Sequence, residues 1–191
     1  MLSSLPITAV PLLILLPAWG CGAEPGTDKV LAHFDFEEAG WSAHSVLSEE
    51  APRAGTRAFM LEGGFNGSNA YSPLLLRGDA DVIDLSWFVR IEALRSPRVQ
   101  LMLLGYVDRP AAHPAIPDAP EHQASASIEK YTESLEAWTP QQASVNVGRV
   151  MPEADWIRIE VRFFAPKIRG EDIQGGRIFL DDVVVTGRRK G

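Results

Sequence analysis

Strict alternation of apolar and polar residues is the feature of this sequence that most constrains its fold. In residues 82–91, alternate positions hold Ile83, Leu85, Trp87, Val89 and Ile91. Successive side chains of a β-strand point to opposite faces, so this stretch is predicted to be a central core strand. Residues 156–164 show the same pattern, with Ile157, Ile159, Val161 and Phe163 inward. We interpret Trp87 and Trp156 as packing residues rather than ligand platforms.

Other strand-like stretches recur at short intervals, separated by Gly, Pro, Asn and Asp, without a βαβ alternation. This pattern predicts an all-β fold, an antiparallel β-sandwich. Residues 99–107 are expected to pair with residues 82–91 as a hairpin through the Arg95-Ser96-Pro97 turn. Pro73 lies within the extended run 70–76, which is therefore predicted to be an edge strand or an interrupted strand.

The region between these strands is less regular. Residues 108–123 contain four prolines and are predicted to form a long surface loop. In the next segment, residues 127–138, Ile128, Tyr131, Leu135 and Trp138 recur at helical spacing after Ser127, a residue type that caps helices. We expect a short amphipathic helix here. The alternative is an extended strand.

Carboxylates interrupt the apolar stretches at both ends of the predicted domain. Asp181 and Asp182 stand in the middle of the run 178–185, so strict alternation would place one of them among apolar neighbours on either face. In residues 30–37, Phe34 and Phe36 share one face, and the acidic residues Asp35 and Glu37 share the other. A buried carboxylate needs a partner. We expect the first and last strands to lie near each other and to share a structural cation; the alternative is bonding of Asp181 and Asp182 to the backbone or to arginine.

The start of the chain is predicted to be an export signal. Residues 5–19 are apolar but too short and too rich in proline to span a bilayer comfortably, and Cys21 follows behind a small glycine. This arrangement resembles the cleavage and acylation site of bacterial lipoproteins. The resulting organisation is a signal peptide at 1–20, a lipid-anchored tether at 21–28 and a β-sandwich domain at 29–188. The expected location is the cell envelope, with lipid anchoring to the membrane through Cys21; the alternative is a non-lipidated periplasmic or secreted protein.

Bulk composition limits the remaining classes. The 191 residues, 46% of them apolar, suffice for one well-buried domain. The formal net charge is -7 at pH 7, and the basic residues are scattered except for a short run at 188–190. Nucleic acid is therefore not expected as a partner, because phosphate binding needs a concentrated positive surface. The single cysteine, at position 21, leaves the domain without a disulfide.

Five short motifs, taken in order, resemble the jelly-roll carbohydrate-binding modules of the galactose-binding-like type. They are 34–37 with Gly40 and Trp41, 53–58, 85–90, 155–159 and 179–183. The resemblance implies a jelly roll and a calcium ion that ties the first and last strands together. It implies Glu37 and Asp181 as side-chain ligands of calcium, with backbone carbonyls near Asp35, Pro52 and Gly55. Carboxylate and carbonyl oxygens suit calcium.

The sequence contains no Gly-rich phosphate loop, zinc-protease helix or nucleophile elbow, so a non-catalytic protein is expected. Together with the resemblance, this favours an exported binding lipoprotein whose ligand is a carbohydrate. Aromatic rings stack on sugars, and the candidates for this role are Trp41, Tyr71, Tyr131 and Trp138. One alternative is a structural or protein-interaction envelope lipoprotein that uses the loop at 108–123. The other is a glycan-active enzyme with paired carboxylates such as Glu49-Glu50.

Overall fold

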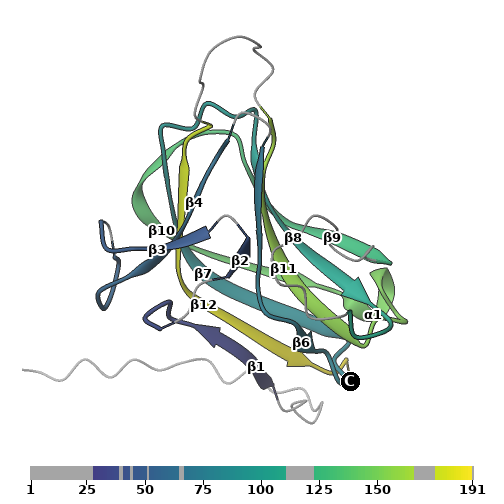
Figure 1. Cartoon of the computed structure of the whole chain (residues 1–191). Helices are drawn as coiled ribbons and strands as arrows, with labels where there is room; N and C mark the ends of the chain where they lie inside the picture. Colours follow the sequence, from purple (N-terminus) through teal and green to yellow (C-terminus); the bar gives the residue numbers. More distant parts are fainter. Residues whose placement is uncertain are drawn as a thin grey trace, which may run out of the picture.

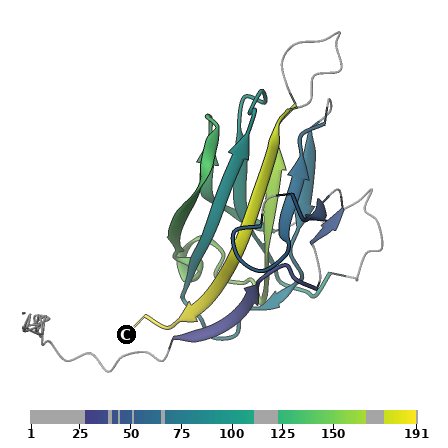
Figure 2. The ribbon, with the colours of Figure 1, turned by 90° about the vertical axis from the view of Figure 1, so that its left-hand side faces the viewer.

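The structure of the protein is a computed structural model that describes residues 28–38, 41–43, 45–50, 52–64, 67–110, 123–165 and 175–190. In this part of the chain, two antiparallel sheets pack face to face as a β-sandwich, which confirms the predicted all-β fold (Figures 1 and 2). The helix present in the described residues is the short α1 (Val147–Val150), capped by the side chain of Asn146.

The first sheet, sheet A, has the strand order β10-β7-β12-β4-β3, and β1 also pairs with β12. Its strands are β1 (Lys29–Phe34), β3 (Ser45–Ser48), β4 (Ala58–Glu62), β7 (Val82–Glu92), β10 (Leu135–Val145) and β12 (Arg177–Arg188). β4 pairs with residues 177–180 of β12, and β1 pairs with residues 183–187. The two short strands therefore follow each other along one edge of β12. The predicted closeness of the first and last strands is confirmed, as Figure 2 shows.

The second sheet, sheet B, has the order β2-β5-β11-β8-β9, and β6 also pairs with β11. Its strands are β2 (Ser42–Ala43), β5 (Ser68–Tyr71), β6 (Leu75–Leu76), β8 (Val99–Tyr106), β9 (Ala124–Tyr131) and β11 (Trp156–Phe163). β5 and β6 both pair with β11 and lie on either side of Pro73. The predicted interruption of this strand is confirmed, since proline cannot donate to the ladder.

The predicted hairpin of residues 82–91 with residues 99–107 is wrong. β7 belongs to sheet A and pairs with β10 and β12, whereas β8 belongs to sheet B and pairs with β9 and β11. The chain crosses from one sheet to the other through residues 93–98, where Ala93 has a positive φ of 47°. The inward side chains of β7 and β8 thus face each other across the core instead of lying side by side.

The predicted helix over residues 127–138 is also wrong, and the extended alternative is correct. This segment contains the end of β9, a turn at 132–134 and the start of β10. Tyr131 pairs with Val99 in sheet B, and Leu135 pairs with Ile91 in sheet A. The turn therefore carries the chain between sheets, and cross-strand pairing overrides the helical spacing of the apolar residues.

The core lies between the sheets. The alternation predicted for β7 is confirmed, because Ile83, Leu85, Trp87, Val89 and Ile91 are all buried. They meet the buried side chains of β11, β8 and β4, among them Ile159, Leu103 and Phe59. The indole Nε1 of Trp87 donates a hydrogen bond to the hydroxyl of Tyr131 at 3.0 Å, so a polar pair is satisfied inside the core.

The closing strand departs from strict alternation. Ile178, Leu180, Val183 and Val185 all belong to the core, because a β-bulge shifts the register of β12 against β7 between Asp181 and Val184. Asp182 occupies the bulge with a positive φ of 47°. The expected placement of the two aspartates on opposite faces is therefore wrong, whereas the expected buried carboxylate is present, because Asp181 is 1% exposed. The bulge leaves both carboxylates outside the core, and each makes polar contacts there.

Candidate functional site

A second cluster of aromatic and charged side chains lies on the outer face of sheet B, away from the core. Its apolar members Tyr71, Leu104 and Tyr106 are buried together apart from the main core, with Trp156 packed against them. Strand register places Glu160 opposite Tyr71, Arg158 opposite Leu104 and Trp156 opposite Tyr106. We call the set Tyr71, Leu104, Tyr106, Trp156, Arg158 and Glu160 the sheet-B cluster.

Arg158 is the central residue of the sheet-B cluster. The carbon at the centre of its guanidinium lies 4.3 Å from the ring centroid of Tyr71 and 5.2 Å from that of Tyr106, so the cation is held against two aromatic rings. Its Nε donates a hydrogen bond to the hydroxyl of Tyr106 at 2.9 Å. The same hydroxyl group's pKa is raised by burial, and the neighbouring Arg158 opposes that shift.

Glu160 is fully buried and forms the anionic part of the cluster. Arg162 binds it with both prongs of its guanidinium, Nε to Oε1 at 2.9 Å and Nη2 to Oε2 at 3.0 Å. This bidentate geometry is the strong form of an arginine–carboxylate pair. Burial and the adjacent Glu160 carboxylate raise the pKa of Tyr71 to about 12, so its hydroxyl remains protonated at neutral pH.

Access to the cluster is uneven. The exposed fractions of Tyr71 and Tyr106 are 4% and 3%, whereas Trp156 and Arg162 are only half-buried. Arg109, which follows β8, lies over the Trp156 ring at 5.1 Å. A ligand on this face would therefore meet Trp156 and the arginines before the tyrosine rings.

Reasoning from the sequence identified only Tyr71 among these residues. Alternation along β11 places Arg158 and Glu160 on the face opposite the core, where charged residues are ordinarily exposed, but both are buried: Arg158 is 9% exposed and Glu160 0%. The available signal was weak. A bulky aromatic at Tyr106, opposite Trp156, indicates an apolar outer patch only when the pairing of β8 with β11 is known.

The other predicted stacking residues lie elsewhere. Trp41 is buried with Phe34, Phe36 and Phe59, and its ring centroid lies 5.2–5.7 Å from theirs. Tyr131 is buried as the partner of Trp87. In this structure both are packing residues, and neither presents an open ring face as a stacking platform must. Trp138 is half-buried on β10, within the part of that strand where register shifts against β7.

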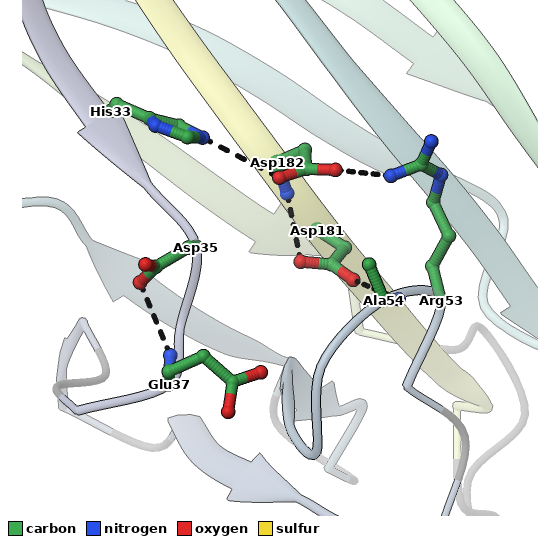
Figure 3. A network of polar contacts seen from close by, with 7 residues as sticks. All are labelled: His33, Asp35, Glu37, Arg53, Ala54, Asp181 and Asp182. Atoms are coloured by element: carbon green, nitrogen blue, oxygen red, sulfur yellow. Dashed lines mark hydrogen bonds and ion pairs between the residues drawn. The ribbon is translucent and has the colours of Figure 1, made fainter.

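The predicted calcium ligands meet at the junction where β12 changes its partner from β4 to β1 (Figure 3). Glu37 follows β1 and accepts hydrogen bonds from the backbone of Thr56 at 2.8 Å and Arg57 at 3.2 Å, and from the Thr56 hydroxyl at 2.7 Å. These hydrogen bonds stabilise the charged carboxylate and lower the pKa of Glu37. The bond from the Thr56 hydroxyl has the largest effect. The carboxylate of Asp35 accepts the Glu37 N–H at 3.2 Å, which tightens the turn after β1.

Asp181 reaches the same loop from β12. It accepts hydrogen bonds from the N–H of Ala54 at 3.2 Å and from the N–H of Asp182 at 2.8 Å, and it is only 1% exposed. Burial raises its pKa, against the effect of these backbone donors. Asp182 is different, because it pairs with the cationic side chain of Arg53 and contacts His33 at 3.4 Å. Figure 3 shows the two neighbouring carboxylates turned toward different partners.

Pro52 and Gly55 belong to the loop between β3 and β4 that both carboxylates hold. Gly55 has a φ of 63°, and a Cβ at this position would lie 2.0 Å from Oε1 of Glu37. Only glycine therefore allows Glu37 to approach the loop this closely.

The atoms of the predicted ligands at this junction that could coordinate a metal ion are all oxygens. The side-chain atoms that could act as metal ligands are carboxylate oxygens. Asp181 is a buried carboxylate that forms no ion pair with any described side chain. No group of three His, Cys, Asp or Glu side chains able to hold a metal occurs in the described residues, so an ion would also need backbone carbonyls. The oxygen-only donor set fits a hard cation, and Glu37, Asp181 and the loop around Pro52 and Gly55 would hold it.

Cys21, the predicted signal peptide and the greater part of the loop at 108–123 lie outside the described residues. Among the residues that are described, no helix is long and apolar enough to cross a membrane.

Comparison with known proteins identifies the fold. No family model and no curated protein matches the sequence. Among solved structures, the CBM22-1 xylan-binding domain of Xyn10C from Paenibacillus barcinonensis matches with a TM-score of 0.56 at 14% identity, over 89% of this chain and all of that domain. The tandem CBM22-1–CBM22-2 domain of the same protein matches with a TM-score of 0.57 at 13% identity, over 90% of this chain and 48% of that one.

A third match is the CBM22-1–GH10 portion of xylanase 10B from Clostridium thermocellum, complexed with xylohexaose. Its TM-score is 0.52 at 17% identity, over 85% of this chain and 29% of that one. At such identities the likeness shows the fold alone. The chain has the β-sandwich fold of carbohydrate-binding modules.

Proposed function

We propose that this protein is a non-catalytic, exported lipoprotein that binds carbohydrate through the outer face of sheet B. The observation that carries the proposal is the sheet-B cluster. Trp156, a member of the cluster, and Arg162, the ion-pair partner of Glu160, are half-buried and accessible. The buried tyrosines, Arg158 and Glu160 support them from beneath. An aromatic ring and a guanidinium can contact the apolar face and the hydroxyls of a sugar. The solved structures of similar fold include domains described as xylan-binding, so xylan is the first polysaccharide to test.

Replacement of Trp156 by alanine is expected to weaken polysaccharide binding at least tenfold, because this ring is the most accessible aromatic of the cluster. Affinity electrophoresis on xylan and a glycan array measure the effect. Trp138→Ala is the matched variant, since it makes the same change on sheet A. If Trp138→Ala weakens binding and Trp156→Ala does not, the ligand sits at the edge of sheet A instead. Failure of the wild-type protein to bind any glycan would refute the proposal.

The near-complete burial of Tyr71 and Tyr106 supports one alternative, a structural or protein-interaction lipoprotein of the envelope. In that case the cluster stabilises the sheet and another surface makes the contact. Crosslinking and pull-down from envelope extracts, carried out with and without competing polysaccharide, distinguish the two functions. A partner protein that is retained at saturating polysaccharide, together with an empty glycan array, would favour this alternative.

The export proposal is that Cys21 becomes the lipidated first residue of the mature protein, so that residues 21–28 tether the domain to the membrane. Two or three acyl chains anchor a protein firmly. We expect Cys21→Ala to move the protein from the membrane fraction to the soluble fraction, as measured by fractionation and mass spectrometry of the mature N-terminus. Wild-type protein found wholly in the soluble fraction would contradict the lipid anchor but not export.

A further inference from the structure

Arg158 carries a charge that the described residues do not neutralise. The residue is 9% exposed, and its Nη2 is buried without any hydrogen-bond partner. Its Nε bonds to the neutral hydroxyl of Tyr106, and it forms no ion pair with a described carboxylate. A buried guanidinium that contacts only neutral groups is costly, and the two tyrosine rings offset only part of that cost.

The charges nearby do not remove this imbalance. Glu160 is the one carboxylate of the sheet-B cluster, and both of its oxygens are already bound by Arg162. Arg109 adds a further cation beside Trp156. The sheet-B cluster and its ion-pair partner Arg162 therefore contain two guanidinium groups but one carboxylate.

We infer that the saccharide bound on this face carries a carboxylate, as a uronic acid does. This inference rests on the proposed function, because it concerns the ligand of the same face. A carboxylate is planar and matches the fork of a guanidinium. A charge-assisted bond to the part of Arg158 that stays accessible would neutralise its charge, although Nη2 itself is buried. A neutral sugar hydroxyl would leave the positive charge of Arg158 unpaired. The acidic group therefore determines which polysaccharides bind tightly.

The test compares two matched probes, xylotetraose and the same oligosaccharide bearing one glucuronic acid branch, by isothermal titration calorimetry. We expect the acidic probe to bind at least tenfold more tightly at low salt. The ratio should fall only in part as sodium chloride is raised to 0.5 M, since salt screens an ionic contact to a largely buried cation less than an exposed one. This salt series uses the unmodified protein and does not depend on a variant that folds.

Arg158→Met should reduce the acidic-to-neutral ratio to near one, because it removes the charge that selects the acidic probe, whatever its effect on the affinity for neutral xylotetraose. Arg90→Met is the matched control, because Arg90 lies over the ring of Phe179 on sheet A and its loss removes the same charge. That control should keep the full ratio. A melting curve establishes that each variant is folded.

The outcomes separate the two proposals. Equal affinity of the wild-type protein for both probes overturns the acidic-ligand inference and leaves carbohydrate binding intact. Binding of neither probe, with no retention on polygalacturonate, overturns the inference and counts against the proposed function. Retention on polygalacturonate but not on its methyl ester would support a carboxylate requirement on a backbone other than xylan.

Discussion

Truncation of Trp87 to alanine should lower the free energy of unfolding by about 4 kcal/mol, the loss typical of a large aromatic removed from a packed core. Trp87 is 2% exposed at the centre of β7, the strand between β10 and β12. The variant also removes the indole N–H that donates a hydrogen bond to the Tyr131 hydroxyl. For a domain of this size, the melting temperature should fall by roughly 8–16 °C. Chemical denaturation and calorimetry provide the measurement.

Two variants calibrate this result. Tyr131→Phe leaves the Trp87 N–H buried without an acceptor and should cost about 1–3 kcal/mol. Trp138→Ala makes the same chemical change as Trp87→Ala at a half-buried position on an edge strand and should cost about 1 kcal/mol. A Tyr131→Phe variant that keeps its stability but loses saccharide binding would return Tyr131 to its predicted role as a ligand contact.

Removal of calcium is expected to lower the melting temperature by roughly 5–10 °C if Glu37 and Asp181 share an ion, as we propose. An ion that binds only the folded state stabilises it by about 2.7 kcal/mol at a hundredfold excess over its dissociation constant. Melting curves with excess chelator and with added calcium measure the effect. Magnesium should substitute poorly, because it demands a smaller octahedral shell.

Variants at the junction identify the ligands. Asp181→Asn and Glu37→Gln should each abolish the dependence on calcium, whereas Asp182→Asn should keep it, because Asp182 already pairs with Arg53. A melting curve that does not respond to chelator, with no metal found by elemental analysis, would leave Asp181 held by backbone N–H groups alone.

The dependence on pH follows from the burial of Asp181. Its pKa is raised in the folded state, so without calcium the charged form costs stability. The contribution of Asp181 to the stability of the calcium-free protein should therefore decline as pH rises from the ordinary carboxyl range through the raised pKa, which a comparison with Asp181→Asn isolates. Calcium should reverse this trend, because the ion binds the charged carboxylate. Calcium titrations monitored by thermal melting at several pH values test both signs.

The sequence predicts the layers of the fold well because strand alternation is a local signal. The inward residues of β7 follow from it. The break at Pro73 follows from the missing N–H of proline, and the closeness of β1 to β12 is inferred from the carboxylates in both strands. Pairing between distant strands is not local. The cross-sheet path of residues 93–98 and the strand at 127–131 depend on partners far along the chain, so the hairpin and the helix were predicted wrongly.

The candidate site was less predictable for a related reason. A charged residue in an alternating strand is usually exposed. Arg158 and Glu160 are nevertheless buried, because β5 and β8 flank β11 and their side chains cover both residues. Nor does alternation anticipate a bulge. Asp181 and Asp182 were placed on opposite faces, but the extra residue in β12 leaves both outside the core.

The position of β1 has a mechanical consequence. β1 pairs only with β12 among the described strands, and its first residue, Lys29, lies opposite Gly187. If residues 21–28 tether the domain to a membrane, as we propose, tension on them would load the β1–β12 ladder before the rest of the sandwich. The junction of Glu37, the 53–57 loop and Asp181 lies at the far end of that ladder. An ion bound there would resist the separation of β1 from β12. The force needed to detach β1 would then depend on the calcium concentration.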